Sequence, residues 1–257
     1  MVKKNIKKFL KKENAIFLPY DQGLEHGPTA FNDKNVDPKY IIEIAKKAKL
    51  NALVLQKGIA EKYSSEIKKS KIPLMIKLNG KTNLVKGDPI SRQVCSVEEA
   101  KNLGAIGVGY TIYLGSIHES KMLQEFSKIE EEAKKFGLVT MIWMYPRGKS
   151  IKGKSKTKLM AYATRVALEL DADFVKVRYE GKKSDLEWAV KSAGKTKVIL
   201  SGGLKKSEKK LLQEIKDLKD AKGTGLAYGR NIWQSENPYE LIKKVKPDIV
   251  VKGGDYQ

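Results

Sequence analysis

The chain has 257 residues, of which 41% are hydrophobic and 32% are charged, a composition typical of a folded globular protein. No apolar run approaches the ~18 residues that span a bilayer, so we exclude a membrane-spanning class. Lys and Arg outnumber Asp and Glu by 51 to 30, and the net charge of +21 is compatible with nucleic acid or an anionic small molecule as the partner.

Strand-like and helix-like segments alternate along the whole sequence. The strands are expected at residues 15–21, 52–56, 73–79, 105–113, 138–145, 173–179, 197–203 and 223–230. The helices are expected near residues 38–49, 58–70, 96–103, 117–136, 156–170, 184–194, 206–219 and 238–245. Strands that are each followed by a helix predict a closed parallel (β/α)₈ TIM barrel of the α/β class. Since the length is usual for one such barrel, we expect a single domain over residues 1–257.

The two ends of the chain add little to this plan. Residues 3–12 predict a short extra amphipathic helix that covers the bottom of the barrel, and residues 252–257 are expected to form a tail. The basic start of the chain has no apolar segment of a secretion signal, and Cys95 is the only cysteine. We therefore expect a cytoplasmic protein without a disulfide.

Lysines occur as adjacent pairs in most of the predicted helices. The pairs are Lys46 and Lys47, Lys68 and Lys69, Lys134 and Lys135, Lys209 and Lys210, and Lys243 and Lys244. No RNP motif, zinc-finger spacing or helix-turn-helix pattern accompanies them. We expect these lysines to lie on solvated outer faces and expect no specific nucleic-acid partner.

Lys176 lies within the apolar run of a predicted buried strand, between Val175 and Val177. Burial lowers the pKa of a lysine because the charged form loses its hydration, and Arg178, two residues along the same strand face, is expected to lower it further. A partly neutral amine attacks carbonyl carbon and forms a Schiff base. The alternative is a structural ion pair with Asp171, Asp173 or Glu180.

Other candidate site residues stand at or near the carboxyl ends of predicted strands, where the catalytic residues of a (β/α)₈ barrel lie. They are Asp21, Lys77, Trp143, Tyr145, Ser201, Gly202, Gly203, Gly229 and Arg230. The two glycine turns, followed by helices, favour a phosphate site, although glycines also simply end strands. A phenol beside a cationic lysine is expected to have a lowered pKa, which makes Tyr145 an acid–base candidate. Core packing is the alternative for Trp143 and Tyr145.

Lys77 and Asp21 form a candidate pair, and His26 is a further candidate in the first loop. Lys77 repeats the pattern of a lysine in an apolar strand, and Asp21 is its candidate partner. A turn or helix-entry role is the alternative for Asp21. His26 lies in the first loop, where a solvated and a substrate-contacting role fit equally well. Since the chain contains two histidines and one cysteine, we expect no zinc site of the usual kind.

Taken together and in order, six motifs resemble the archaeal-type class I fructose-1,6-bisphosphate aldolases, a family that also includes aminodideoxyheptulosonate synthases. The motifs are LPYDQGLEHGP (18–28), LMIKLNGKTNL (74–84), WMYPRG (143–148), FVKVRY (174–179), LSGG (200–203) and AYGRNIWQ (227–234). The first motif resembles the aldolase branch more than the synthase branch. The resemblance extends over essentially the whole chain.

The resemblance implies a Schiff-base aldolase of glycolysis and gluconeogenesis that uses no metal or other cofactor. Lys176 would condense with fructose 1,6-bisphosphate, Tyr145 would transfer protons, Trp143 would shape the pocket and Asp21 would orient or deprotonate hydroxyls. Ser201, Gly202, Gly203, Gly229 and Arg230 would hold one phosphate, and a basic loop with Arg147 would meet the other. Lys77 would contact the substrate or position Asp21, His26 would contact the substrate, and a homo-oligomer is implied. A related synthase acting on another phosphosugar and a nucleic-acid-binding protein remain as alternatives.

Overall fold

The structure is a computed structural model that describes the backbone of residues 5–250 and the side chains of residues 5–246. The expected tail at residues 252–257 lies outside the described residues, as do the first two residues of the expected N-terminal helix. Among the described residues, no helix combines the length and the apolar character that a membrane crossing requires.

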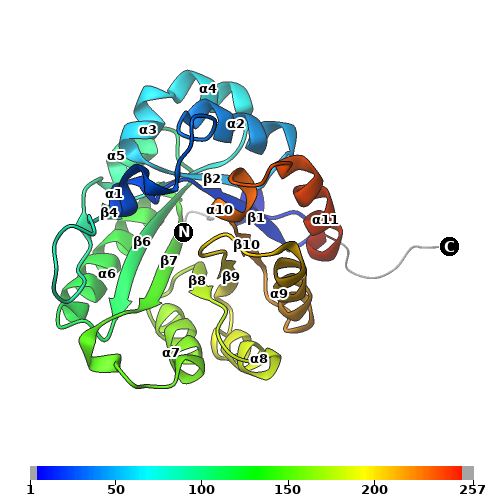
Figure 1. The fold of residues 1–257 in the computed structure, drawn as a ribbon. Helices are drawn as coiled ribbons and strands as arrows, with labels where there is room; N and C mark the ends of the chain where they lie inside the picture. The colour runs from blue at the N-terminus through cyan, green and yellow to red at the C-terminus, as the bar shows by residue number, and fades with distance from the viewer. Residues whose placement is uncertain (1–4, 251–257) are drawn as a thin grey trace.

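Eight parallel strands form a closed barrel in the order β1-β10-β9-β8-β7-β6-β3-β2, surrounded by helices (Figure 1). The strands are β1 (Ala15–Pro19), β2 (Ala52–Gln56), β3 (Leu74–Lys77), β6 (Gly107–Leu114), β7 (Val139–Pro146), β8 (Phe174–Arg178), β9 (Lys197–Ser201) and β10 (Gly225–Ala227). The predicted (β/α)₈ barrel is therefore confirmed. An additional antiparallel pair, β4 (Asn79–Gly80) and β5 (Arg92–Gln93), was not predicted.

Helices follow the strands with the predicted alternation. The longer ones are α2 (Pro38–Lys47), α6 (Glu119–Phe136), α7 (Lys156–Glu169), α8 (Lys183–Ser192), α9 (Glu208–Asp220) and α11 (Pro238–Val250). The shorter ones are α1 (Gly23–His26), α3 (Lys57–Lys62), α4 (Ser64–Ser70), α5 (Val97–Asn102) and α10 (Arg230–Trp233). The single helix predicted over residues 58–70 was wrong, because the backbone leaves helical geometry at Tyr63. The last predicted strand is also shorter than expected, since Arg230 already begins α10.

Local sequence explains where several of these elements begin and end. Asp37 caps α2 by accepting a hydrogen bond from the Lys39 N–H, and Ser96 and Ser207 cap α5 and α9 in the same way. Gly137 ends α6 in a left-handed conformation at φ 65°, which glycine adopts at low cost. The strands are apolar on both faces because one face lines the barrel and the other meets the helices.

The N-terminal segment covers the amino-terminal end of the barrel, as expected, but differs in form. Asn5–Phe9 is one short 3-10 helix rather than a helix through residue 12, where the backbone turns at positive φ. Phe9 is fully buried and stacks on Phe17 with ring centroids 5.6 Å apart, and Phe174 meets it edge-on at 6.4 Å. This aromatic cluster fills the inside of the barrel below the polar end.

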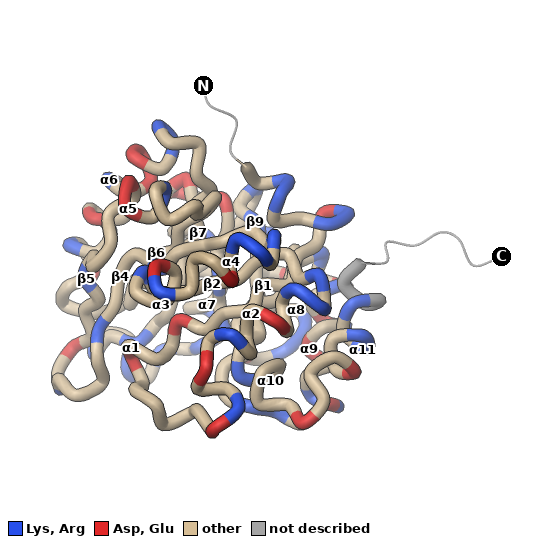
Figure 2. The backbone as a smooth tube through the Cα atoms, turned by 90° about the horizontal axis from the view of Figure 1, so that it is seen from above, with Lys and Arg blue, Asp and Glu red and all other residues tan. Residues whose placement is uncertain are grey.

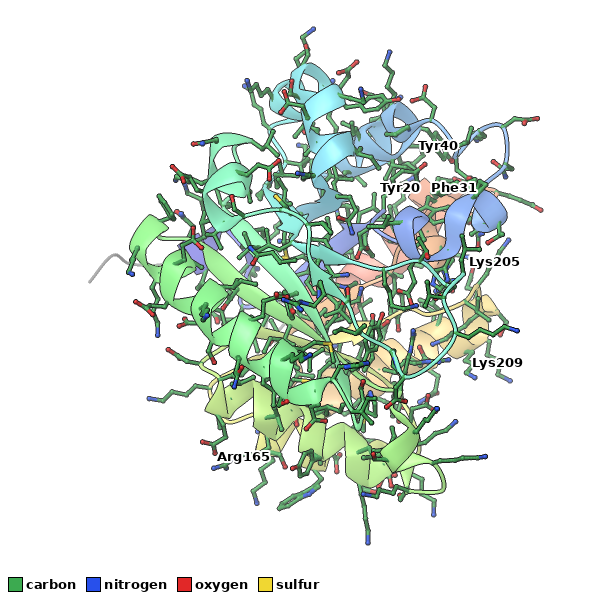
Figure 3. The ribbon with its side chains drawn as sticks, turned by 90° about the vertical axis from the view of Figure 1, so that its left-hand side faces the viewer. Tyr20, Phe31, Tyr40, Arg165, Lys205 and Lys209 are labelled. Carbon is green, nitrogen blue, oxygen red and sulfur yellow. The ribbon has the colours of Figure 1, made fainter. Side chains whose placement is uncertain are left out.

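Charged residues are spread over the molecular surface rather than gathered on one element (Figure 2). All five lysine pairs singled out from the sequence are exposed, which confirms the prediction of solvated outer faces. Lys209 of one such pair, on α9, extends away from the body of the protein, as does Arg165 on α7 (Figure 3).

Candidate active site

A cavity of about 260 Å³ opens among the carboxyl ends of the barrel strands. Its wall contains all but one of the predicted site residues, namely Asp21, His26, Lys77, Trp143, Tyr145, Arg147, Lys176, Ser201, Gly203, Gly229 and Arg230. Residues more than 200 positions apart in the chain thus meet at one end of the barrel, where such barrels carry out their chemistry.

Strand register determines which of these side chains are neighbours. Trp143 on β7 is the direct partner of Lys176 on β8, and Arg178 two residues later is the partner of Ser201 on β9. Because side chains alternate along a strand, Lys176 and Arg178 share the inner face of the barrel. The Nζ atoms of Lys77 and Lys176 lie 5.2 and 5.0 Å from the centre of a Trp143 ring. The indole therefore adjoins both amines, a favourable contact when they are charged.

Lys176 is 5% exposed and its surroundings lower its pKa to about 8. Burial is the main cause, and Arg230 adds to it, whereas Asp21 and Glu25 raise the pKa. The expected contribution of Arg178 was wrong. Its guanidinium lies exposed at the rim, with Nε 3.5 Å from Glu180 Oε1, so the cation that acts on Lys176 is Arg230.

The alternative of a structural ion pair for Lys176 was also wrong. Lys134 Nζ lies 2.5 Å from Asp171 Oδ2, and Asp173 Oδ2 accepts a hydrogen bond from the Thr140 N–H. Both carboxylates are at the start of β8, at the other end of the strand, and Glu180 faces Arg178. The amine of Lys176 therefore lies in the cavity without a direct carboxylate partner among the described residues.

Asp21 and Lys77 form the pair that the sequence indicated. Lys77 Nζ lies 3.6 Å from Asp21 Oδ2, and both side chains are largely buried. Asp21 follows Tyr20, whose ring packs against Phe31 with centroids 5.2 Å apart (Figure 3). The Tyr20 hydroxyl donates to the Asn35 carbonyl at 2.7 Å. This packing fixes the backbone that carries Asp21.

Tyr145 lies in the same cavity, but the expected lowering of its pKa was wrong. Burial is the largest effect and raises the pKa, and the charge of Asp21 raises it further. The Ser201 hydrogen bond, Lys77 and Arg147 act in the opposite direction without cancelling the burial. Tyr145 is therefore a neutral phenol near neutral pH, which makes it a proton donor in the resting site.

The two glycine turns face the cavity with Gly203, Gly229 and Arg230, but Gly202 does not line it. The Gly202 N–H donates to the Ala227 carbonyl at 3.2 Å, and a Cβ there would lie 2.8 Å from Asn231 Nδ2. Gly202 is thus required for close packing behind the site, and its predicted place on the cavity wall was wrong. The sequence pattern of glycines at a strand end does not distinguish a glycine that lines the cavity, such as Gly203, from one that packs behind it, such as Gly202.

Asn231 joins the two turns. Its Nδ2 donates to the Gly202 and Leu204 carbonyls, and its Oδ1 accepts from the Lys206 N–H at 2.9 Å. Trp233, two residues later, donates from Nε1 to the Pro19 carbonyl at 3.2 Å. Helix α10 is therefore tied both to the loop after β9 and to the end of β1, which positions Arg230.

Beside the predicted Arg147 and His26, the cavity wall contains polar side chains that the sequence reasoning did not assign to the site, namely Glu25, Gln56 and Tyr113. Arg147 Nη1 lies 3.1 Å from Glu25 Oε1, and the Arg147 guanidinium lies 4.8 Å from the centre of the Tyr145 ring. His26, whose pKa is lowered mainly by burial, meets Asn83 Nδ2 at 2.8 Å through Nδ1. Gln56 and Tyr113 end β2 and β6, so the strand-end rule indicated these two positions. Glu25 lies on the short helix α1 rather than at a strand end, so the strand-end rule did not indicate it.

Metal-ligating side chains do not gather here. Among the described residues, no group of three or more His, Cys, Asp or Glu side chains is arranged to hold a metal ion. Cys95 is buried away from the cavity wall, and burial raises the pKa of its thiol to about 12. A protonated buried thiol is a poor nucleophile.

Residues 15–235 match the model of the DeoC/LacD family aldolases, and this stretch contains every residue that lines the active-site cavity. The chain belongs to the DeoC/LacD aldolase family. This membership agrees with the resemblance seen in the six motifs. It also agrees with a site centred on a buried lysine near the end of a barrel strand.

Relatives of this DeoC/LacD family aldolase match most of its length. The class 1 fructose-bisphosphate aldolase of Thermoproteus tenax is 45% identical over 246 residues, 95% of this chain and 92% of the relative. That of Halobacterium salinarum is 41% identical over 230 residues, 89% and 87% of the two chains. A solved archaeal fructose-1,6-bisphosphate aldolase has its catalytic lysine covalently bound to the carbinolamine intermediate of the substrate. It is 41% identical, with a TM-score of 0.89 over 96% of this chain and 98% of the other.

Proposed function

We propose that this protein is a class I fructose-1,6-bisphosphate aldolase, which reversibly cleaves the sugar to dihydroxyacetone phosphate and glyceraldehyde 3-phosphate. The observation that carries the proposal is Lys176, a buried amine of lowered pKa in a cationic cavity. Class 1 fructose-bisphosphate aldolases match this chain over most of its length, which supports the same activity. The cations and glycine turns of the cavity suit a substrate with two phosphates.

In the first half of the reaction, the neutral Lys176 amine attacks the C2 ketone and gives a carbinolamine. Tyr145, a neutral phenol in the resting site, donates its proton to the carbinolamine hydroxyl, which leaves as water. The resulting iminium is the electron sink for the next step, and it also stabilises the nearby phenolate. No bound metal is needed to withdraw electrons, so we propose that the reaction uses no cofactor.

In the second half, the phenolate of Tyr145 removes the proton from the C4 hydroxyl while the bond between C3 and C4 breaks. Glyceraldehyde 3-phosphate leaves, and the electron pair of the broken bond becomes part of an enamine on Lys176. Tyr145 then returns its proton to C3, and water hydrolyses the iminium to release dihydroxyacetone phosphate. Asp21, held by Lys77, is placed to orient the sugar hydroxyls, and the Trp143 indole forms the wall beside the reacting carbon.

We assign one phosphate to Ser201, Gly203, Gly229 and Arg230, with Gly202 packing behind them. The second phosphate would meet Arg147 and the basic loop that follows it, and His26 and Lys77 would contact the sugar. The order of neighbouring strands supports this division, since β8 with Lys176 lies between β7, which precedes Arg147, and β9. The reacting carbon of an extended bisphosphate would then sit between two anion sites.

Of the remaining proposals, the single domain rests on the chain length, the cytoplasmic location on the single cysteine, and the homo-oligomer on the family resemblance. We propose that residues 1–257 form one domain, that the protein is cytoplasmic and that it assembles as a homo-oligomer. We propose no specific nucleic-acid partner, because the exposed lysines are dispersed rather than aligned along one groove. Weak DNA binding that disappears between about 50 and 200 mM salt would reflect counterion release only.

Substrate comparison tests the proposed activity. The purified protein should cleave fructose 1,6-bisphosphate with chelator present and yield both triose phosphates in a coupled assay. Fructose 1-phosphate should be a poorer substrate, because it lacks the second phosphate. Failure to turn over the bisphosphate, combined with turnover of another phosphosugar or with transfer to another electrophile, would instead favour the related synthase.

A further inference from the structure

Glu25 forms an ion pair with Arg147 across the mouth of the active-site cavity. Glu25 lies on α1 after β1, whereas Arg147 follows β7, 122 residues away. Glu25 Oε1 is 3.1 Å from Arg147 Nη1 and also accepts from the Tyr113 hydroxyl at 3.3 Å. The guanidinium lies over the Tyr145 and Tyr113 rings, 4.8 and 5.8 Å from their centres. The arginine that faces the catalytic phenol is therefore already occupied by a carboxylate.

This ion pair is suited to exchange. It is a single contact through one nitrogen and one oxygen, and the Arg147 side chain is 43% exposed. Partly exposed ion pairs of this kind contribute little to stability. A phosphate dianion carries more charge than a carboxylate and accepts two parallel hydrogen bonds from a guanidinium. When Arg147 leaves, Glu25 retains the Tyr113 hydroxyl, so its carboxylate is not left without a hydrogen bond.

We propose that Glu25 is a specificity-determining residue that holds Arg147 until the distal phosphate of the sugar replaces it. The inference rests on the proposed function and adds an exchange of partners to it. A substrate with one phosphate leaves the Glu25–Arg147 pair in place, whereas a bisphosphate takes over Arg147. Glu25 thereby weakens the binding of every ligand that presents a phosphate at this position.

The same exchange affects the release of the first product. After the carbon–carbon bond breaks, glyceraldehyde 3-phosphate carries the phosphate bound to Arg147, while the other product stays covalently attached to Lys176. Return of Glu25 to Arg147 competes with that phosphate and favours departure of the aldehyde. Without the Glu25 charge, we expect tighter substrate binding together with stronger product inhibition.

The test compares the Glu25→Gln variant with the parent protein, using fructose 1,6-bisphosphate and fructose 1-phosphate as substrates. The amide keeps the shape and the oxygen acceptor but removes the charge. The ratio of kcat/KM for the bisphosphate to that for the monophosphate should rise about twofold to fivefold, the range of a partly exposed ion pair. The inhibition constant of glyceraldehyde 3-phosphate should fall by a similar factor. Glu25→Asp, whose carboxylate is one methylene shorter, should change both values in the same direction.

Two further variants make the result specific. In an Arg147→Ala background, Glu25→Gln should no longer change the substrate ratio, because its partner is absent. Glu180→Gln removes a similar charge from the Arg178 pair at the same rim and should leave the ratio at the parent value. If Glu25→Gln reduces activity on both substrates equally, or leaves the ratio unchanged in an active enzyme, the inference is wrong. If the parent protein does not cleave the bisphosphate, the proposed function itself fails.

Discussion

The reactivity of the site depends on the environment of one amine. With a pKa of about 8, Lys176 is neutral in roughly one tenth of the molecules at pH 7, against roughly one in several thousand for an ordinary lysine. Burial inside the barrel beside the Trp143 ring is the main cause of this difference, and the charge of Arg230 adds to it. The cost of keeping an unpaired lysine in the barrel is consistent with a chemical role.

The pH dependence of Schiff-base formation should report this pKa directly. The folded pKa of Lys176 lies below that of a free lysine, so the reactive neutral form increases as pH rises and reaches half near pH 8. The initial rate of adduct formation with dihydroxyacetone phosphate, trapped with cyanoborohydride from about pH 6 to about pH 10, should rise and level off beyond that midpoint. A rate that still rises steeply at pH 10 would indicate an ordinary, solvated lysine.

Tyr145→Phe tests the assignment of proton transfer. The phenyl ring keeps the packing against Arg147 but has no proton to donate, so kcat should fall about 10²- to 10⁴-fold. Lys176 should still form a trapped adduct, more slowly than in the parent protein. Tyr162→Phe is the matched control, because that side chain is 63% exposed on α7, and it should change kcat less than about twofold. Equal activity of the two variants would remove Tyr145 from the mechanism.

At the scale of elements, the close approach of α10 to the end of β1 brings Arg230 into the cavity. A Cβ on Gly229 would lie 2.3 Å from the Pro19 carbonyl oxygen and 3.0 Å from Trp233 Nε1. Neither the strand backbone nor the buried indole has room to move away. The glycine is therefore needed for close approach rather than for an unusual backbone angle.

Gly229→Ala should accordingly displace α10, lower the free energy of unfolding by about 1–3 kcal/mol and raise KM for phosphorylated substrates. Gly58→Ala provides a control, because Gly58 lies in helix α3 with open space around its Cβ position. That substitution should stabilise the protein by about 0.5–1 kcal/mol and leave KM unchanged. Urea denaturation and steady-state kinetics would distinguish the two. A Gly229→Ala protein with parental stability and KM would contradict this packing argument.

Much of the barrel and of its site was predictable because both follow repeating rules. Alternation of strands and helices predicted the topology, and the strand-end rule found Lys77 and Ser201. Lys176 was found as a lysine within an apolar strand. Contacts between the segments that connect the strands follow no such rule. The pairing of Glu25 with Arg147 depends on the paths of the short helix α1 and of the loop after β7, 122 residues apart in the chain.

The predictions that failed depended on quantities that sequence spacing does not contain. The direction of the Tyr145 pKa was wrong because the sequence shows a nearby cation but not the depth of burial, which is the larger effect. Arg178 was in the right place on the strand, yet its long side chain turns to Glu180. Gly202 and Gly203 are adjacent in the sequence, and only the course of the backbone shows which one faces the cavity.

For the whole molecule, the two ends of the barrel have different tasks. The carboxyl end carries the site, whereas the amino end is closed by the N-terminal segment, with Phe9 packed on Phe17 and Phe174. The dispersed lysines on the outside contribute much of the net charge. Stability and activity should therefore respond separately to changes at the two ends.

Phe9→Ala should test this separation. Removing a fully buried ring should lower the free energy of unfolding by about 3–5 kcal/mol, while kcat/KM of the folded enzyme stays within about twofold. Phe136→Ala, at a position 36% exposed near the end of α6, should cost much less. Chemical denaturation of both variants gives the comparison. A loss of activity that exceeds the loss of folded protein would show that the bottom of the barrel acts on the site.

The central claim is that Lys176 forms the covalent bond to substrate. Incubation of the protein with dihydroxyacetone phosphate and borohydride, followed by intact mass measurement and peptide mapping, tests it most directly. We predict one reduced adduct per chain, located on Lys176, formed equally well with chelator and absent from Lys176→Met. An adduct on another lysine, or none in a protein that still cleaves fructose 1,6-bisphosphate, would contradict the account.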